Sequence, residues 1–264
     1  MENIKITSID GIILEAAIHY TQQDSPHGCI ILAHGITANM DAGIFVRLAD
    51  RLTKNGFHVL RFSYRGHGKS GGTQRGMTIA GEMQDLLAVI DFASERFKQP
   101  TAILAASFGA VSTCLLIPDM NKQIRGIALW NPVLDLKRTF IHPELPWGEK
   151  YFNNEKVVKL MSDGFILLNG TFEFGRVLWE EMKWYEPNRY FLESSIPSMI
   201  VHGDRDTCIS YAIAREAAQK SQHCDFYTIA GSDHGFGERT AEAEVIDITA
   251  NWLTKLFGKD NPHK

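Results

Sequence analysis

The stretch of sequence that decides the fold is TAILAASFG, residues 101–109. Its first five residues form a short apolar run that is typical of a buried strand, and a helix is expected over about residues 108–116. Ser107 then lies on a tight turn between strand and helix, where small residues two positions before and after it let backbone segments approach closely. Taken alone the pattern is common, and a turn serine that caps the helix is the competing interpretation.

Strands and helices alternate on both sides of this turn. Apolar runs predict strands at residues 29–33, 57–62 and 126–130, and the alternation resumes with strands at 198–202 and 226–230. Helices are predicted between them and up to about residue 256, and a hairpin from two alternating segments near residues 4–8 and 12–18. The order predicts an α/β fold with a mostly parallel sheet and helices on both faces.

An aromatic-rich segment of roughly residues 132–187 interrupts the alternation. It carries three of the five tryptophans, Trp147, Trp179 and Trp184. These aromatics could serve packing alone, but an aromatic layer over strand ends is also what an apolar substrate pocket needs. We therefore predict an N-terminal core part at 1–131, a lid insertion at 132–190 and a C-terminal core part at 191–264. Within the lid, Trp147 and Trp184 are the candidate substrate-binding residues.

Three further segments follow predicted strands, where open α/β sheets place their chemistry. HGDRD at 202–206 offers the carboxylates Asp204 and Asp206, either of which could orient an imidazole. GSDHG at 231–235 offers His234, a general base suited to neutral pH, and we interpret its neighbour Asp233 as structural. Each segment is a weak signal alone, but a serine, an acid and a histidine after different strands favour nucleophilic catalysis.

The fourth segment is AHGIT at residues 33–37, after another predicted strand. A tetrahedral intermediate needs two backbone N–H donors for its oxyanion, and we predict that Ile36 and Phe108 supply them. Gly35 lets the backbone turn toward the site, and with His34 it is a candidate substrate-binding residue.

Over nearly its whole length the chain resembles the α/β-hydrolase superfamily. His34 with Gly35 looks like the oxyanion loop of that superfamily, YRGHGKS at 64–70 like its R-G-x-G-x-S segment, and the segments at 203–206 and 234–235 like its acid and base loops. The resemblance implies an eight-stranded sheet with a helical lid between the sixth and seventh strands. It also implies an acyl-serine mechanism without a cofactor or metal, with Ser107 as nucleophile, His234 as base and Asp206, three residues after the glycine, as acid.

One position departs from the family pattern, because Ala105 stands where the first glycine of the serine turn is usual. Alanine is small enough for the turn, but the departure loosens any subfamily assignment. Short segments at 55–59, 105–107 and 231–234 are also similar to the acyl-carrier thioesterases of bacterial luminescence systems, and the general motifs are similar to cinnamoyl and monoacylglycerol esterases. These likenesses make a fatty-acyl thioester an alternative substrate.

The sequence predicts a serine hydrolase that cleaves a carboxylic ester or thioester of an apolar or aromatic small molecule. A fatty-acyl thioesterase or acyltransferase, and an amidase or peptidase, remain alternatives because the same residues serve them. A non-catalytic ligand receptor and a scaffold protein are the competing classes, and the fold alone excludes neither.

Composition and charge narrow the partners. The net charge is −4 with scattered Lys and Arg, so neither nucleic acid nor an anionic membrane surface is indicated. No apolar run of about eighteen residues predicts a spanning helix, and no signal peptide is evident. The cysteines form no C-x-x-C pair and are interpreted as reduced thiols. A cytoplasmic enzyme acting on a small acyl substrate fits these features, and a homodimer is left open.

Overall fold

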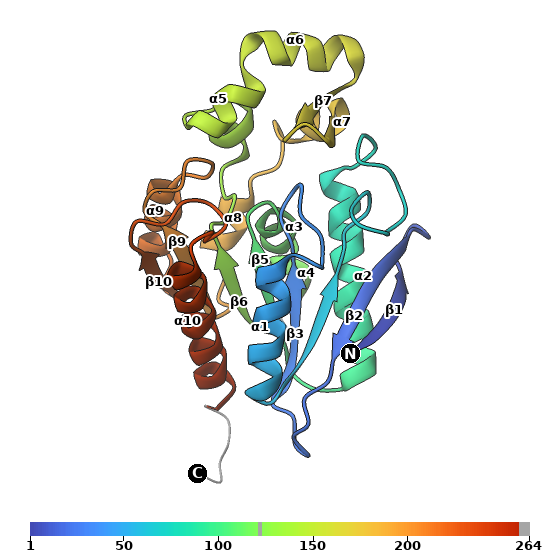
Figure 1. Cartoon of the computed structure of the whole chain (residues 1–264), viewed down its shortest axis with the longest axis vertical. Helices are drawn as coiled ribbons and strands as arrows, with labels where there is room; N and C mark the ends of the chain where they lie inside the picture. The colour runs from blue at the N-terminus through green and yellow to red at the C-terminus, as the bar shows by residue number, and fades with distance from the viewer. Residues whose placement is uncertain (121–122, 259–264) are drawn as a thin grey trace.

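The computed structural model describes residues 1–120 and 123–258, and within them eight strands form one sheet (Figure 1). The strand order is β1-β2-β4-β3-β5-β6-β9-β10, in which β2 runs antiparallel to both of its neighbours, β1 and β4, and all other neighbouring pairs are parallel. The strands are β1 Glu2–Thr7, β2 Ile13–His19, β3 Gly28–Ala33, β4 Phe57–Phe62, β5 Thr101–Ala106, β6 Ile124–Trp130, β9 Ser198–Gly203 and β10 Cys224–Ile229. The predicted fold class, an α/β-hydrolase fold with a mostly parallel sheet, is confirmed.

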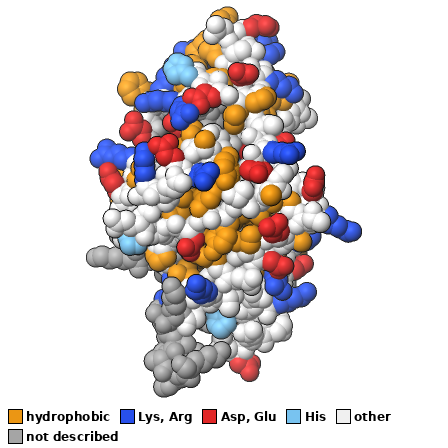
Figure 2. Space-filling view, turned by 90° about the vertical axis from the view of Figure 1, so that its left-hand side faces the viewer, with side chains coloured by type: hydrophobic (Ala, Val, Ile, Leu, Met, Phe, Trp, Pro, Cys, Tyr) orange, Lys and Arg blue, Asp and Glu red, His pale blue; other side chains and the backbone are white. Residues whose placement is uncertain are grey.

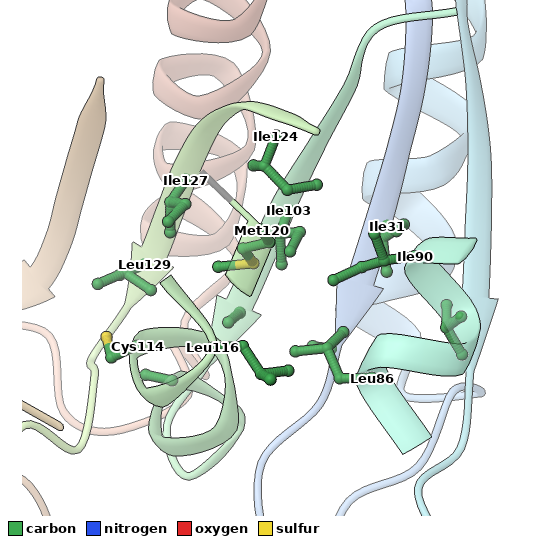
Figure 3. Packing of buried hydrophobic residues seen from close by; sticks show 14 of the residues in the cluster. Ile31, Leu86, Ile90, Ile103, Cys114, Leu116, Met120, Ile124, Ile127 and Leu129 are labelled. Carbon is green, nitrogen blue, oxygen red and sulfur yellow. The ribbon is translucent and has the colours of Figure 1, made fainter. Parts of the chain in front are cut away.

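Helices cover both faces of this sheet because its parallel strands are apolar on both sides. In β3, Ile30 and Leu32 pack toward α1 and α10, whereas Ile31 packs with α2, α3 and α9 on the opposite face. Figure 3 shows Ile31 and Ile103 of the strands beside side chains of α2, α3 and α4. The helices are α1 Gly43–Lys54, α2 Ile79–Phe97, α3 Gly109–Leu115, α4 Ile117–Met120, α9 Tyr211–Lys220 and α10 Arg239–Gly258.

Between β6 and β9 the chain leaves the sheet and forms an insertion at the top of the molecule (Figure 1). Its first part is η1 Lys137–Ile141, α5 Pro146–Phe152 and α6 Asn154–Asp163; the second is the hairpin of β7 Phe165–Leu168 and β8 Phe172–Gly175, then α7 Arg176–Glu181 and α8 Pro187–Leu192. The insertion therefore contains a β-hairpin beside its helices. Its last helix, α8, spans the predicted boundary at residue 190 and packs against α3 of the core.

Besides the packing of α8 on α3, the insertion is held to the core through the loop that follows β4. Arg75 of this loop forms a bidentate ion pair with Glu173 of β8, with N–O distances of 2.6 and 2.8 Å. Its guanidinium carbon also lies 3.4 Å from the ring centre of Phe165. Glu181 of α7 accepts a hydrogen bond from the backbone N–H of Ile79 at the start of α2. Charged and aromatic contacts thus fix the hairpin against one core loop.

The surface is mixed in charge. On the face drawn in Figure 2, hydrophobic side chains gather at mid-height, and acidic and basic side chains are intermingled around them. None of the helices within residues 1–120 and 123–258 is both long and apolar enough to cross a membrane.

Candidate active site

The turn after β5 forces Ser107 into a strained and projecting conformation. Its φ is +53°, a left-handed value that is uncommon for any residue with a side chain. Its N–H donates to the Trp130 carbonyl at 2.8 Å and its carbonyl accepts from the Val133 N–H at 3.1 Å, so β6 and the segment after it hold the turn from both ends.

Two glycines, Gly109 after the turn and Gly35 in the loop after β3, allow the backbone segments around Ser107 to approach closely. A Cβ added at Gly109 would lie 2.5 Å from the His34 carbonyl oxygen, and one at Gly35 would lie 2.8 Å from the Ser107 Cβ. Real Cβ atoms essentially never approach this closely, so a larger residue at either position would push the loop after β3 away from Ser107. The two glycines therefore set the spacing between the serine turn and that loop.

His234 links Ser107 to Asp206. The His234 Nε2 atom lies 3.1 Å from the Ser107 Oγ, and its Nδ1 atom lies 2.8 Å from the Asp206 Oδ2. Because a carboxylate can only accept, Nδ1 carries the proton and Nε2 presents its lone pair to the serine hydroxyl. The structure thus brings together three side chains from loops after β5, β9 and β10.

Asp206 is buried and its carboxylate is saturated with hydrogen-bond donors. Oδ1 accepts from the backbone N–H groups of Cys208 and Ile209, both at 2.8 Å, and Oδ2 lies 3.3 Å from the His202 Nε2 as well as accepting from His234. Burial by itself would raise the pKa of Asp206, but the hydrogen bonds from His202 and His234 outweigh it and hold the pKa well below its usual value. The carboxyl group is therefore ionised at neutral pH.

The two neighbouring aspartates serve the loops rather than the histidine ring. Asp204, the rival acid, accepts from the Gly231 N–H at 2.6 Å. The Asp233 Oδ1 accepts from the backbone N–H groups of Thr207 and His234, at 2.8 and 2.7 Å. Both carboxylates therefore tie the loop after β9 to the loop after β10.

The loop after β3 exposes the backbone donors that the sequence analysis names. Among the described residues, the N–H groups of Ile36 and Phe108 donate no hydrogen bond. His34 holds this loop: its Nε2 accepts from the Tyr64 N–H at 3.0 Å, so its Nδ1 donates to the Gly35 carbonyl at 2.9 Å. Burial lowers the pKa of His34 well below its usual value, which keeps the ring neutral and in this tautomer.

A cavity of about 450 Å³ opens beside Ser107 and is walled mostly by apolar side chains. Core loops supply His34, Gly35, Ile36 and Phe108, and the insertion supplies Phe140, Trp147 and Asn169. Trp184 does not belong to this site, because it is 81% exposed on the turn after α7 and is not among the described residues that line the cavity. A hollow of similar volume between the starts of η1 and α8 has several charged walls and lies away from Ser107.

The structure places here several residues that no local sequence pattern singles out. His202 is a second donor to Asp206, and its position directly before Gly203 in the acid loop is the one signal that could have found it. Phe140 and Asn169 face the cavity from the insertion, where sequence alone offered many equivalent aromatics. Their selection depends on how the insertion folds back over the strand ends.

One group of side chains near the site could reach a metal ion. Ligand atoms of Asp206, Cys208 and His234 all lie within 4.8 Å of one another. Burial raises the pKa of the Cys208 thiol to about 12, and the nearby Asp206 carboxylate adds to that shift, which disfavours the thiolate that a metal would need. Asp206 and His234 are moreover bonded to each other, so we assign the group no metal.

The part of the chain that matches a known family contains the whole candidate site. The family described as serine aminopeptidase, S33, matches residues 24–237, a segment that includes Ser107, Asp206 and His234. The chain belongs to this family. The S33 match leaves out only the first strand pair and the last helix, α10.

Curated relatives and solved structures are also similar to this chain. An acyl transferase from Photorhabdus laumondii is 28% identical over 82% of this chain and 71% of its own length; one from Vibrio campbellii is 27% identical over 81% and 70%. The structure of Est1E from Butyrivibrio proteoclasticus with ferulic acid bound matches with a TM-score of 0.84 at 21% identity, covering 97% of this chain and all of that one. An esterase from Pyrococcus furiosus matches with a TM-score of 0.73 at 20% identity, covering 96% and 90%. The protein is thus a member of a hydrolase family and has the α/β-hydrolase fold.

Proposed function

We propose that this protein is a serine hydrolase that cleaves a carboxylic ester or thioester through an acyl-serine intermediate. The observation that carries the proposal is the continuous hydrogen-bonded chain from Ser107 through His234 to the ionised Asp206, beside an apolar cavity. Ser107 differs from an ordinary turn serine because an imidazole nitrogen lies within hydrogen-bond distance of its hydroxyl and can accept its proton.

In the first half-reaction, His234 Nε2 takes the Ser107 proton as the oxygen attacks the acyl carbon. The oxyanion that forms is stabilised by the unpaired N–H groups of Ile36 and Phe108. Asp206 stabilises the imidazolium and keeps its ring oriented. His234 then gives the proton to the leaving alcohol or thiol, and the acyl group remains on Ser107.

The second half-reaction returns the enzyme to its starting state. His234 takes a proton from water, the water oxygen bonds to the acyl carbon, and the Ser107–acyl bond breaks as the proton passes to the serine oxygen. The product is a carboxylic acid, and neither half-reaction changes an oxidation state.

The cavity supports an apolar acyl or alcohol group as the larger part of the substrate. Phe140 and Trp147 offer aromatic walls in a site of roughly the size of a small-molecule pocket. The insertion, residues 132–190 in our division, would act as a lid because these side chains come from it.

The decisive experiment compares Ser107→Ala with the wild type on p-nitrophenyl esters and acyl-thioesters of graded chain length. Wild type should release p-nitrophenol and be labelled by a fluorophosphonate, whereas the variant should lose nearly all turnover and all labelling at an unchanged unfolding temperature. Ser221→Ala, at the end of α9, is the matched control and should keep both activities. Labelling of the Ser107→Ala protein would overturn the proposal.

Acyl transfer is the second candidate, and the acyl transferases of Photorhabdus and Vibrio favour it. It uses the same acyl-serine, but an alcohol, amine or thiol replaces water in the second half-reaction. Product analysis with an added acceptor separates the two, because a transferase forms the new ester or amide even when water is in large excess.

A further inference from the structure

A second and much smaller cavity adjoins the large one and shares six of its nine wall residues with it. It has a volume of about 70 Å³, and Ser107 and His234 are part of its wall. Three of its residues, Trp130, Asn131 and Phe236, do not line the large cavity. We call this space the small compartment. A molecule held in it lies against both the serine and the histidine.

Asn131, the residue directly after β6, is built into this wall in an unusual way. It is 2% exposed, and its φ of +42° places it in the left-handed region that asparagine tolerates better than most residues. Its N–H donates to the Val201 carbonyl at 3.0 Å, and its side-chain Oδ1 accepts from the Gly203 N–H at 3.0 Å. Because only the amide oxygen can accept, the orientation of the side-chain amide is determined.

The other end of this amide, the Nδ2 group, is left without a partner. It makes no hydrogen bond to any residue within 1–120 or 123–258. The Nδ2 group is not fully buried, so a water can reach it and accept its hydrogen bond. The neighbouring Trp130 offers no such donor, since its indole N–H already donates to Thr249 at 2.9 Å.

The small compartment has the right size and chemistry for water. A space of about 70 Å³ exceeds what one water needs, but it is small for the apolar part of most esters. The large cavity, several times greater in volume, is the better place for the acyl group and for bulky leaving groups. The amide of Asn131 favours an oxygen in the small compartment.

We propose that the small compartment holds the water that hydrolyses the acyl-enzyme, with the Asn131 amide positioning it beside His234. This inference rests on the proposed acyl-serine mechanism. The water donates its proton to His234 Nε2 and its oxygen bonds to the acyl carbon; the Ser107–acyl bond breaks and the proton passes to the serine oxygen. Asn131 is a positioning residue. Because it holds water beside His234, the acyl group is transferred to water in preference to larger acceptors.

The test measures how the acyl-enzyme divides between water and a bulky alcohol. Wild type and Asn131→Asp are acylated with p-nitrophenyl butyrate in the presence of 2-phenylethanol, whose ring is too large for the small compartment. Aspartate keeps an acceptor for the Gly203 N–H and tolerates the backbone conformation, but removes the free donor. We expect deacylation by water to slow about tenfold, and the ratio of phenylethyl butyrate to butyric acid to rise by a similar factor.

This ratio separates water positioning from a general effect on the site. Water and alcohol attack the same acyl-enzyme with the same base, so a change in the strength of His234 alters both rates and leaves their ratio unchanged. Thr207→Val, which loses a hydroxyl contact to Asp233 but does not line the small compartment, is the matched control and should not change the ratio. Asn131→Gly, which accepts the positive φ, should change it in the same direction as Asn131→Asp.

An unchanged ratio in both Asn131 variants would overturn the inference. The inference would also be overturned if the Asn131 variants changed only the relative acylation rates of methyl and phenyl esters. That outcome would show that the small compartment holds the leaving group of the ester and not water. If wild type gives neither a p-nitrophenol burst nor fluorophosphonate labelling, the proposed function itself fails. A normal burst with an unchanged ratio removes only the water site.

Discussion

Asp206 is the most heavily bonded side chain of the site. Two backbone N–H groups hold one carboxylate oxygen, and His202 and His234 meet the other. With each oxygen engaged twice, the carboxylate cannot rotate without breaking hydrogen bonds, and the ring of His234 takes its orientation from it. The loop after β9 therefore orients the His234 ring through the Asp206 carboxylate.

We predict that Asp206→Asn lowers kcat by on the order of a thousandfold or more, because the amide no longer stabilises the imidazolium or selects its tautomer. The matched variant Asp204→Asn retains an oxygen for the Gly231 N–H and should lower kcat by less than about tenfold. Steady-state kinetics on one p-nitrophenyl ester decides between them. Equal losses in the two variants would contradict the assignment of Asp206 as the orienting acid.

At the scale of elements, the β7–β8 hairpin couples the insertion to the loop that follows β4. Besides the Arg75–Glu173 pair, the backbone of Gly175 at the end of β8 lies directly against the backbone of Arg75. A Cβ at Gly175 would collide with the Arg75 carbonyl group. The hairpin can therefore dock only while this position is glycine.

Gly175→Ala should loosen the insertion without unfolding the sheet. Overpacking of this kind costs about 1–3 kcal/mol, so the undocked state becomes about 5 to 160 times more populated. Limited proteolysis should then cut within residues 153–175 faster by a similar factor. Gly237→Ala is the matched control, because neither Gly175 nor Gly237 has a positive φ and a Cβ added at Gly237 meets no atom within 4 Å. Equal cleavage of the two variants would refute tight docking at Gly175.

At the scale of the whole molecule, Glu82 is a buried acid that forms no ion pair with any residue within 1–120 or 123–258. Glu82 in the first turn of α2 is 2% exposed, and burial raises its pKa well above the usual value, with nearby Asp85 adding to the shift. Arg65 opposes that shift, whereas Glu181 from the insertion adds to it. A carboxyl group whose pKa is raised on folding binds its proton more tightly in the folded than in the unfolded protein.

This difference makes the free energy of unfolding fall as pH rises above the unfolded-state pKa of Glu82, because the unfolded chain releases the proton more readily. We predict that Glu82→Gln stabilises the protein by about 1–3 kcal/mol near pH 8 and has little effect near pH 4. Urea unfolding at the two pH values measures this. Glu95→Gln, exposed on the same helix, should show no such pH-dependent gain. A loss of stability at the higher pH would contradict the prediction.

Local patterns sufficed to predict the sheet and the elements that carry the site. The apolar run of β5 followed by Ser107, and the polar segments after β3, β9 and β10, lie where periodicity places strand ends. The boundaries agreed within a few residues, as with β9, expected at residues 198–202 and found at Ser198–Gly203. The insertion was recognised by its break in alternation, but its hairpin was not predicted, because short apolar runs fit helix and strand equally well.

The sequence by itself determined the α/β architecture and the loops from which a serine, an acid and a histidine project, because these depend on neighbours within a few residues. The resemblance to the superfamily already favoured Asp206 as the acid. Only the tertiary structure decided that Asp204 bonds the Gly231 N–H instead, that Trp147 lines the cavity while Trp184 is exposed, and that the Asn131 amide is left free beside Ser107. Each of these outcomes depends on contacts between segments many residues apart, and no local pattern encodes the relative position of such segments.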